Sequence, residues 1–312
     1  MIRLWKVPHI LKGMLTWVPV LNTWRLHHAT TGGTDSLRYC YSVWLRHLVT
    51  LHHFGFKIHR AQVGELGPGD SIGVGLAALL SGANAYVGLD VVAYSAKSGL
   101  EKIFDELVEM YSHREPIPDQ NEFSRVRPTL DSYAFPDHAV DFRGFAEKVA
   151  SIRSELQSGV NSGESVRYRA PWIGASCIPS GSLDLVFSQS VLQYADDLEE
   201  TYGAMAQWLK PGGHASHTID LSGHYLSPYW NGHRAYSDYE WSLARGRREF
   251  FLNREPLSTH LACAKKAGFE MLLVKKEYNT PGLGRDDLAR RFRTLDDEDL
   301  RTRGVMLVLR KI

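Results

Sequence analysis

Short apolar runs alternate along the chain with stretches of helical periodicity. The short runs predict strands at 61–66, 86–90, 166–170, 183–188 and 214–221, and 183–188 has the near-continuous hydrophobicity of a buried parallel strand. The periodic stretches predict helices at 72–81, 98–110, 142–156, 197–209 and 256–267. Two closing apolar runs predict an antiparallel pair of strands at the sheet edge, at 269–274 and 304–309. We therefore expect an α/β fold, with a seven-stranded, mostly parallel sheet and helices on both faces.

Residues 1–60 precede this alternation and predict an N-terminal helical cap. Basic and apolar residues over 1–26 allow a second interpretation, an amphipathic segment in peripheral contact with a membrane surface. Pro8, Gly13 and Pro19 would interrupt a long helix, which favours the cap packed on the main domain.

The remaining chain, 61–312, is expected to form one domain. Residues 95–160 are too long for a plain crossover between strands and predict a helical insertion after the second strand. Insertions of this kind often cover a binding site, so we expect this one to act as a substrate lid.

Before the domain, Arg46 and His47 lie on a predicted helix at 37–54 and are expected at its solvated rim.

Composition and charge narrow the classes of partner. A net charge of +1 gives no overall field that would favour nucleic acid, so we do not expect this partner. The three cysteines, Cys40, Cys177 and Cys263, are far apart and indicate neither a disulfide framework nor a zinc site. The sequence has no apolar run long enough for a transmembrane helix, and a cytoplasmic protein is expected. The sequence leaves open whether the protein forms a homodimer.

The most informative stretch runs from Val63 to Asp90. A short strand leads into the turn Gly67-Pro-Gly69, a buried helix follows, and a second strand ends at Asp90. The glycines let a ligand approach the backbone, and a carboxylate about 20 residues further on is placed to hold a ribose diol. Ile72 replaces the third glycine of a dinucleotide fingerprint. Glu65 would repel a pyrophosphate and attract an ammonium, which indicates a nucleoside with a cationic tail.

Together with two later motifs, these residues resemble the class I S-adenosylmethionine-dependent methyltransferases. Glu65-Leu-Gly67-Pro-Gly69 is similar to the first motif of the family, and Asp90 to the acidic residue after its second strand. Residues 182–197 resemble the fourth-strand motif, and 209–213 resemble the turn before the fifth strand. The resemblance implies a Rossmann-like fold, a methyltransferase domain over 61–312 and S-adenosyl-L-methionine as the cofactor.

The resemblance also implies roles for single residues. Glu65 and the glycines would surround the methionine part of the cofactor, and Asp90 would bind the ribose. Trp172 stands where the family has an acidic residue, and it either stacks on adenine or belongs to the core. The residues expected to bind the cofactor are Glu65, Gly67, Pro68, Gly69, Asp70, Asp90, Val91, Pro171, Trp172, Ser188, Gln189 and Ser190. Ser71 replaces the third glycine of the family motif.

Candidate catalytic residues gather where the fifth predicted strand ends. Methyl transfer to a hydroxyl needs a base, and His217, Asp220 and His224 lie at the edge of the sheet where such folds bind ligands. His224, just past the strand, is the favoured base, with Asp220 to orient it. For His217 the alternative is a satisfied core histidine. The spacing of the three matches no metal motif, so we expect no metal.

These features predict a methyltransferase for a small molecule or sugar, with O-methylation favoured by the histidine cluster. Two alternatives remain. One is an NAD-dependent oxidoreductase of similar fold, against which Ile72 argues. The other is a non-catalytic cofactor-binding module. Basic and aromatic residues at 229–234 and 245–254 could line an acceptor site, but a cap helix with a solvated basic face is the favoured interpretation.

Overall fold

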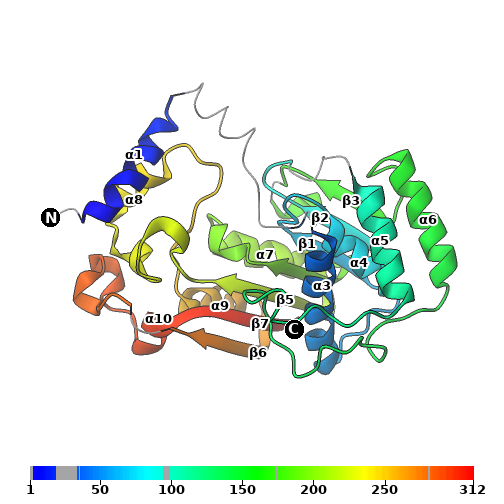
Figure 1. Cartoon of the computed structure of the whole chain (residues 1–312). Helices are drawn as coiled ribbons and strands as arrows, with labels where there is room; N and C mark the ends of the chain where they lie inside the picture. Colours follow the sequence, from blue (N-terminus) through cyan, green and yellow to red (C-terminus); the bar gives the residue numbers. More distant parts are fainter. Residues whose placement is uncertain (1–2, 19–33, 35, 94–98, 173, 280–281) are drawn as a thin grey trace.

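The computed structural model describes residues 3–18, 34, 36–93, 99–172, 174–279 and 282–312. Its centre is a seven-stranded sheet in the order β3-β2-β1-β4-β5-β7-β6 (Figure 1). The strands are β1 Gln62–Leu66, β2 Ala85–Leu89, β3 Val166–Arg169, β4 Leu183–Gln189, β5 Leu209–Asp220, β6 Phe269–Tyr278 and β7 Thr302–Lys311. Only β7 runs against the others, because it pairs antiparallel with both β5 and β6. The mostly parallel sheet and the antiparallel closing pair are both confirmed.

Helices cover both faces of the sheet, as predicted. One face packs against α3 (Leu37–His53), α4 (Gly73–Leu80), α5 (Leu100–Ser112) and α6 (Phe145–Ser158) in one continuous core. The other face packs against α7 (Leu198–Trp208) and α9 (Leu257–Lys266) in a second core. Alternate side chains of one strand serve the two cores: Leu185 and Phe187 face the first, and Val186 faces the second.

A third, smaller core lies beyond the carboxyl ends of the central strands, in a part that we call the cap lobe. It joins α1 (Val7–Leu15), α8 (Asp238–Arg245) and the short turns η4 (His224–Leu226) and η5 (Gly232–Ala235). Figure 1 shows α1 beside α8 at the end of the molecule opposite α6. Trp5 and Ile10 pack there against Tyr236 and Trp241. The helices of the predicted N-terminal cap therefore lie apart, since α3 belongs to the main core.

The described part of the insertion between β2 and β3, residues 99–160, packs on one face of the sheet and along α3. Its helices α5 and α6 pack on the face that α4 covers, and its long loop runs along α3. There the guanidinium of Arg46 donates hydrogen bonds to the carbonyls of Pro118, Val126 and Pro128. Arg46 and His47 are fully buried, so their predicted place at a solvated rim was wrong. The loop supplies the partners that make this burial tolerable.

Some boundaries differ from the predictions. β5 begins at Leu209, so the motif at 209–213 forms the first part of a strand instead of a separate turn. Pro19 and the other residues at 19–26 of the predicted membrane segment lie outside the described residues. Within the described ranges, we find no helix with the length and hydrophobicity that crossing a bilayer requires. The chain closes with α10 (Asp297–Arg301) before β7.

Candidate cofactor and acceptor site

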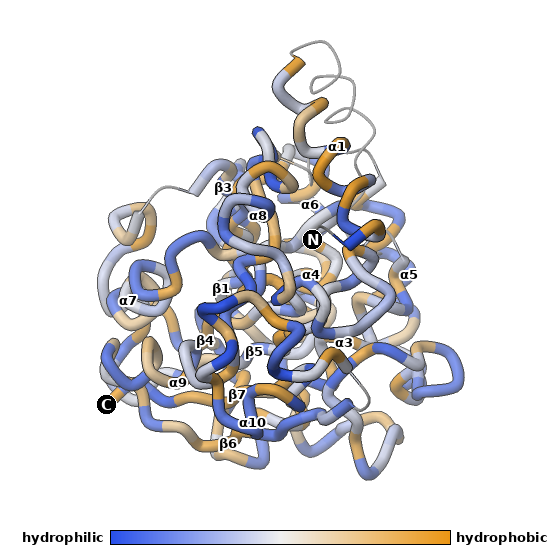
Figure 2. The backbone as a smooth tube through the Cα atoms, turned by 90° about the vertical axis from the view of Figure 1, so that its left-hand side faces the viewer, coloured by the Kyte–Doolittle hydropathy of each residue, from blue (hydrophilic) through white to orange (hydrophobic). Residues whose placement is uncertain are grey.

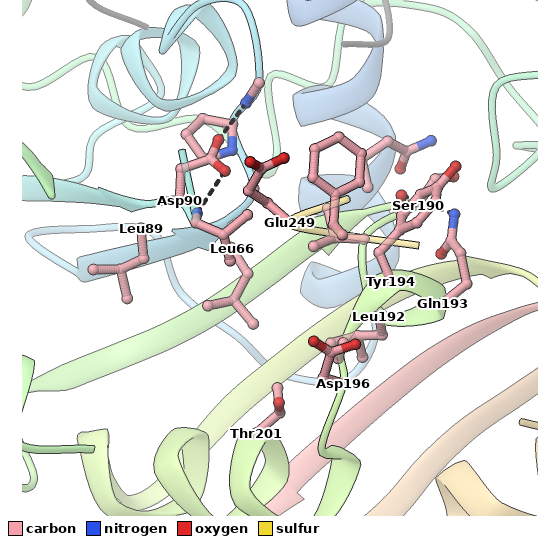
Figure 3. A pocket seen from close by; sticks show the side chains of 18 of the residues that line it. Leu66, Leu89, Asp90, Ser190, Leu192, Gln193, Tyr194, Asp196, Thr201 and Glu249 are labelled. Atoms are coloured by element: carbon pink, nitrogen blue, oxygen red, sulfur yellow. Dashed lines mark hydrogen bonds between the residues drawn. The ribbon is translucent and has the colours of Figure 1, made fainter. Parts of the chain in front are cut away.

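One large cavity opens at the carboxyl ends of β1, β2 and β4 and extends beneath the cap lobe. Its volume is about 940 Å³, near the upper end of the usual range for small-molecule sites. Figure 3 shows Asp90 on one side of it, and Ser190 and Tyr194 on the other. Ligands of open α/β sheets bind at this edge of the strands. The cavity therefore has the position and the size for a nucleoside cofactor together with a second reactant.

The glycine-rich turn forms one wall of this cavity. Gly67 and Gly69 have φ angles of +63° and +74°, a region that L side chains rarely adopt. A Cβ atom at Gly67 would also lie 2.7 Å from a methyl carbon of Val191. Both the backbone and the neighbouring side chain thus require glycine, and they leave the turn open to a ligand.

Asp90 stands just past β2 and is oriented by two backbone groups. The N–H of Gly69 donates to one carboxylate oxygen at 3.2 Å, and the N–H of Val91 donates to the other at 2.7 Å (Figure 3). The backbone N–H of Trp172 donates to the carbonyl of Asp90 at 2.9 Å, which fixes the Trp172 residue beside it. Burial raises the pKa of Asp90, while the backbone hydrogen bonds oppose this rise.

Glu65 is the most strongly perturbed carboxyl group of the cavity. It is only 2% exposed, and burial raises its pKa to about 8. The hydroxyl of Tyr86 donates to it at 2.6 Å. The Tyr86 ring reaches this position because it lies against Gly75 of α4, where a Cβ would come within 2.2 Å of the ring. A buried acid in this position gains a partner when a cation binds beside it.

The end of β4 is held by a buried hydrogen-bond network. The side-chain oxygen of Gln189 accepts from the Thr218 hydroxyl at 2.8 Å and from Nε2 of His47 at 3.0 Å. Nδ1 of His47 lies 2.7 Å from the Ser216 hydroxyl, so one neutral tautomer with its proton on Nε2 satisfies both contacts. Burial lowers the pKa of His47 to about 4, which keeps this ring neutral. Next to Gln189, Ser190 has a φ of +55°.

A short chain of polar groups lies between β5 and the cavity wall. Nε2 of His224 lies 3.5 Å from a carboxylate oxygen of Asp220, and its Nδ1 lies 3.3 Å from the Tyr194 hydroxyl. The N–H of Ser222 donates to the other Asp220 oxygen at 2.9 Å. His224 and Tyr194 line the cavity, whereas Asp220 stands behind them. The arrangement places a carboxylate beside an imidazole, where it can orient the ring and stabilise its protonated form.

His217 does not fit its predicted catalytic role. Its side chain is fully buried in the sheet, with Nδ1 2.8 Å from the Ser188 hydroxyl, and it does not line the cavity. Burial lowers its pKa to about 3, so it is neutral. The alternative of a core histidine describes its position, because β5 turns this side chain towards α7 and α9, where Tyr202 lies against it. Ser188 is buried with it and does not line the cavity.

The cavity brings together most of the residues predicted to bind the cofactor. Those that line it are Glu65, Gly67, Pro68, Gly69, Asp90, Val91, Trp172, Gln189 and Ser190. Asp70, Pro171 and Ser188 do not line it. Among the described residues, no group of three or more His, Cys, Asp or Glu side chains could hold a metal ion.

The acceptor half of the cavity comes largely from residues that the sequence did not identify individually. Tyr194 and Gln193 follow β4, Tyr225 lies in η4, and 248–252 is an extended segment after α8. The predicted cap helix thus ends at Arg245, and the next residues line the cavity. Within the described ranges, no residue of 99–160 contributes to the lining. The aromatic clusters around 229–254 were the one signal in the sequence for this wall.

Comparison with known proteins gives one match to a family model. Residues 147–216 match the model described as a methyltransferase domain. This range runs from α6 through β4 and α7 into β5, and it does not include the glycine-rich turn. A search of curated proteins finds no match.

Solved structures of methyltransferases align with much of this chain at low identity. An S-adenosylmethionine-dependent methyltransferase from Mesorhizobium loti is 13% identical, with a TM-score of 0.41 and coverage of 84% of this chain and 96% of that one. One from Methanosarcina mazei is 10% identical, with a TM-score of 0.43 and coverage of 84% and 97%. Phosphoethanolamine N-methyltransferase 2 of Haemonchus contortus, solved with S-adenosyl-L-methionine, is 16% identical, with a TM-score of 0.42 and coverage of 86% and 52%.

Proposed function

We propose that this chain, in which residues 147–216 match a methyltransferase domain, is a class I S-adenosylmethionine-dependent methyltransferase that methylates a hydroxyl group of a small molecule or sugar. The proposal of a hydroxyl acceptor rests on one observation, the series of contacts from Asp220 through His224 to Tyr194 at the cavity wall. A neutral hydroxyl is a weak nucleophile, and a base that takes its proton strengthens it.

The residues of the first cavity half fit S-adenosylmethionine. Asp90, with its carboxylate oriented by two N–H groups, would accept hydrogen bonds from the ribose hydroxyls. Glu65 would face the ammonium of the methionine part, and the backbone of the turn at Gly67 and Gly69 would approach it. When bound, the cofactor supplies an electrophilic methyl group on its sulfonium. The protein's own residues then have to place the acceptor in line with that group and exclude water.

His224 is the group that would take the acceptor proton. Its Nε2 lies 3.5 Å from Asp220, so the neutral tautomer with its proton on Nε2 would leave the lone pair on Nδ1, the nitrogen that lies near Tyr194 at the cavity wall. The Tyr194 contact, 3.3 Å long, is at the weak end of hydrogen bonding, so an acceptor hydroxyl can compete for Nδ1. As the acceptor oxygen takes the methyl group and the S–CH₃ bond breaks to leave S-adenosylhomocysteine, the hydroxyl proton would move to Nδ1, and Asp220 would stabilise the resulting imidazolium.

The test compares His224→Ala with a matched control, His113→Ala, an exposed histidine at the end of α5. Release of S-adenosylhomocysteine is measured over panels of hydroxyl and amine acceptors, together with calorimetric affinity for S-adenosylmethionine. We expect turnover of a hydroxyl acceptor to fall by about 100-fold or more in His224→Ala, with unchanged cofactor affinity. His113→Ala should behave as wild type. Full turnover in His224→Ala, or activity confined to amines, would contradict the proposal.

A further inference from the structure

The helix α1 packs against the protein with its apolar stripe turned outwards. Leu4, Val7, Leu11, Met14, Leu15 and Val18 recur at helical spacing along one side of the segment 4–18, and each is at least 39% exposed. We call these residues the α1 stripe. Figures 1 and 2 both show α1 at the margin of the molecule, and its tube carries apolar stretches in Figure 2. A surface helix of a globular protein normally turns this side to the core.

The inward side of the helix explains why it cannot simply roll over. Gly13 lies so close to α8 that a Cβ there would be 2.0 Å from the Leu243 carbonyl oxygen. Lys6, which is 5% exposed, donates to the Ala235 carbonyl and forms an ion pair with Glu240, both at 2.7 Å. Rotation of α1 would break this buried ion pair and force a larger residue against α8. The packing of α1 on α8 therefore holds the α1 stripe in its outward orientation.

Charge around the α1 stripe indicates what it contacts. Residues 3–18 contain no acidic residue; their Arg3 and Lys6 are paired with Asp287 and Glu240, and Lys12 and His9 are the other basic residues. Lys12 is exposed beside the stripe, and Arg247 lies over the ring of Trp17 at 4.6 Å, with Trp17 itself 56% exposed. A second copy of this chain would bring the same cations together around the stripe. Anionic lipid headgroups would instead complement them, while the stripe and Trp17 enter the acyl boundary.

We propose that α1 is an interfacial helix that docks this protein on an anionic membrane surface. The docked helix lies in the plane of the bilayer, with the α1 stripe buried among lipid chains and Lys12 and Arg247 at the headgroups. The cavity opens close by, because the Tyr225 ring, which lines it, lies 6.1 Å from the ring of His9 on α1. Docking thus brings the mouth of the cavity to the membrane.

Cosedimentation with vesicles tests this inference without any measurement of activity. The probes are vesicles of phosphatidylcholine alone and vesicles of equal parts phosphatidylcholine and phosphatidylglycerol. Wild type should bind the anionic vesicles, and added salt should weaken this binding. The double variant Leu11→Glu/Leu15→Glu should lose about ten-fold or more in binding, because it places two charges in the stripe. Its side chains face solvent, so its circular dichroism should match wild type.

Two further variants separate the explanations. Ile312→Glu alters an apolar residue that is 84% exposed at the other end of the chain and should bind vesicles as wild type does. Lys12→Glu keeps the stripe intact and should weaken binding to anionic vesicles only. Wild type that stays in the supernatant with both vesicles would overturn the proposal, as would equal binding by Leu11→Glu/Leu15→Glu. Dimerisation that this variant abolishes, without vesicle binding, would overturn it in favour of a second copy of the chain.

Discussion

Substitution of Glu65 by glutamine should change stability and cofactor affinity in opposite directions. Burial raises the pKa of Glu65 from 4.5 to about 8, so the folded protein holds a proton that the unfolded chain releases across this range. The contribution of this group to stability is therefore full below pH 4.5 and falls as the pH rises towards 8. Each pH unit in this window costs about 1.4 kcal/mol. From about pH 5 to about pH 7.5 the loss is about 3 kcal/mol.

Glutamine does not titrate, and its carbonyl oxygen can still accept the hydrogen bond from Tyr86. The free energy of unfolding of Glu65→Gln, relative to wild type, should therefore rise by about 3 kcal/mol between these two pH values. Urea unfolding followed by tryptophan fluorescence, without cofactor, measures it at each pH. Glu101→Gln, which replaces an exposed glutamate of α5, serves as the control and should follow wild type.

The same substitution should weaken binding of S-adenosylmethionine, because the ammonium loses its carboxylate partner. Removal of one member of a buried charge pair costs about 2–5 kcal/mol, which corresponds to a loss in affinity of at least about 30-fold. If the free energies of unfolding of Glu65→Gln and wild type change with pH in the same way, the conclusion that burial raises the pKa of Glu65 is refuted. A variant that gains stability at neutral pH yet keeps full affinity would refute the assignment of Glu65 to the ammonium.

Two further predictions concern the turn at Gly67 and the buried His260. Gly67→Ala should cost about 1–3 kcal/mol of stability, more than Gly212→Ala, because both glycines have positive φ but only the first would touch Val191. Urea unfolding measures the stability of both variants, and an equal loss of stability in the two would contradict the predicted contact with Val191. His260 lies fully buried in α9, and this burial lowers its pKa to about 3. The neutral ring therefore stabilises the fold above pH 6.5, and this contribution is lost as the pH falls towards 3. The free energy of unfolding of His260→Gln, relative to wild type, should be about 2 kcal/mol higher at about pH 5 than at about pH 7. A difference between the two proteins that is the same at both pH values would contradict this.

The sheet, and the glycine-rich turn and Asp90 that line the cavity, were predictable because their causes are local. Parallel strands buried on both faces leave apolar runs, and the sharp turn at Gly67 and Gly69 needs glycine wherever it occurs. Asp90 follows from its spacing after that turn. Each of these features depends on neighbours in the sequence, so one sequence was enough to identify them.

The acceptor half was less predictable because its residues meet only in the folded chain. Tyr194 follows β4, while Tyr225 and Phe250 come from segments around α8 that have no clear periodicity. His47 looked like a polar residue on an amphipathic helix, and its burial depends on Gln189 and Ser216, which are far away in the sequence. The orientation of α1 likewise depends on α8. Periodicity predicts that a helix is amphipathic, and its partner decides which side faces solvent.

Calorimetric titration of S-adenosylmethionine tests the central claim most directly. Wild type should bind one molecule per chain, and Asp90→Ala should bind about a hundredfold more weakly, because the ribose hydroxyls lose a charged acceptor. Circular dichroism of Asp90→Ala should match wild type. Unchanged affinity in Asp90→Ala, or a wild-type protein that binds NAD and not S-adenosylmethionine, would contradict the account.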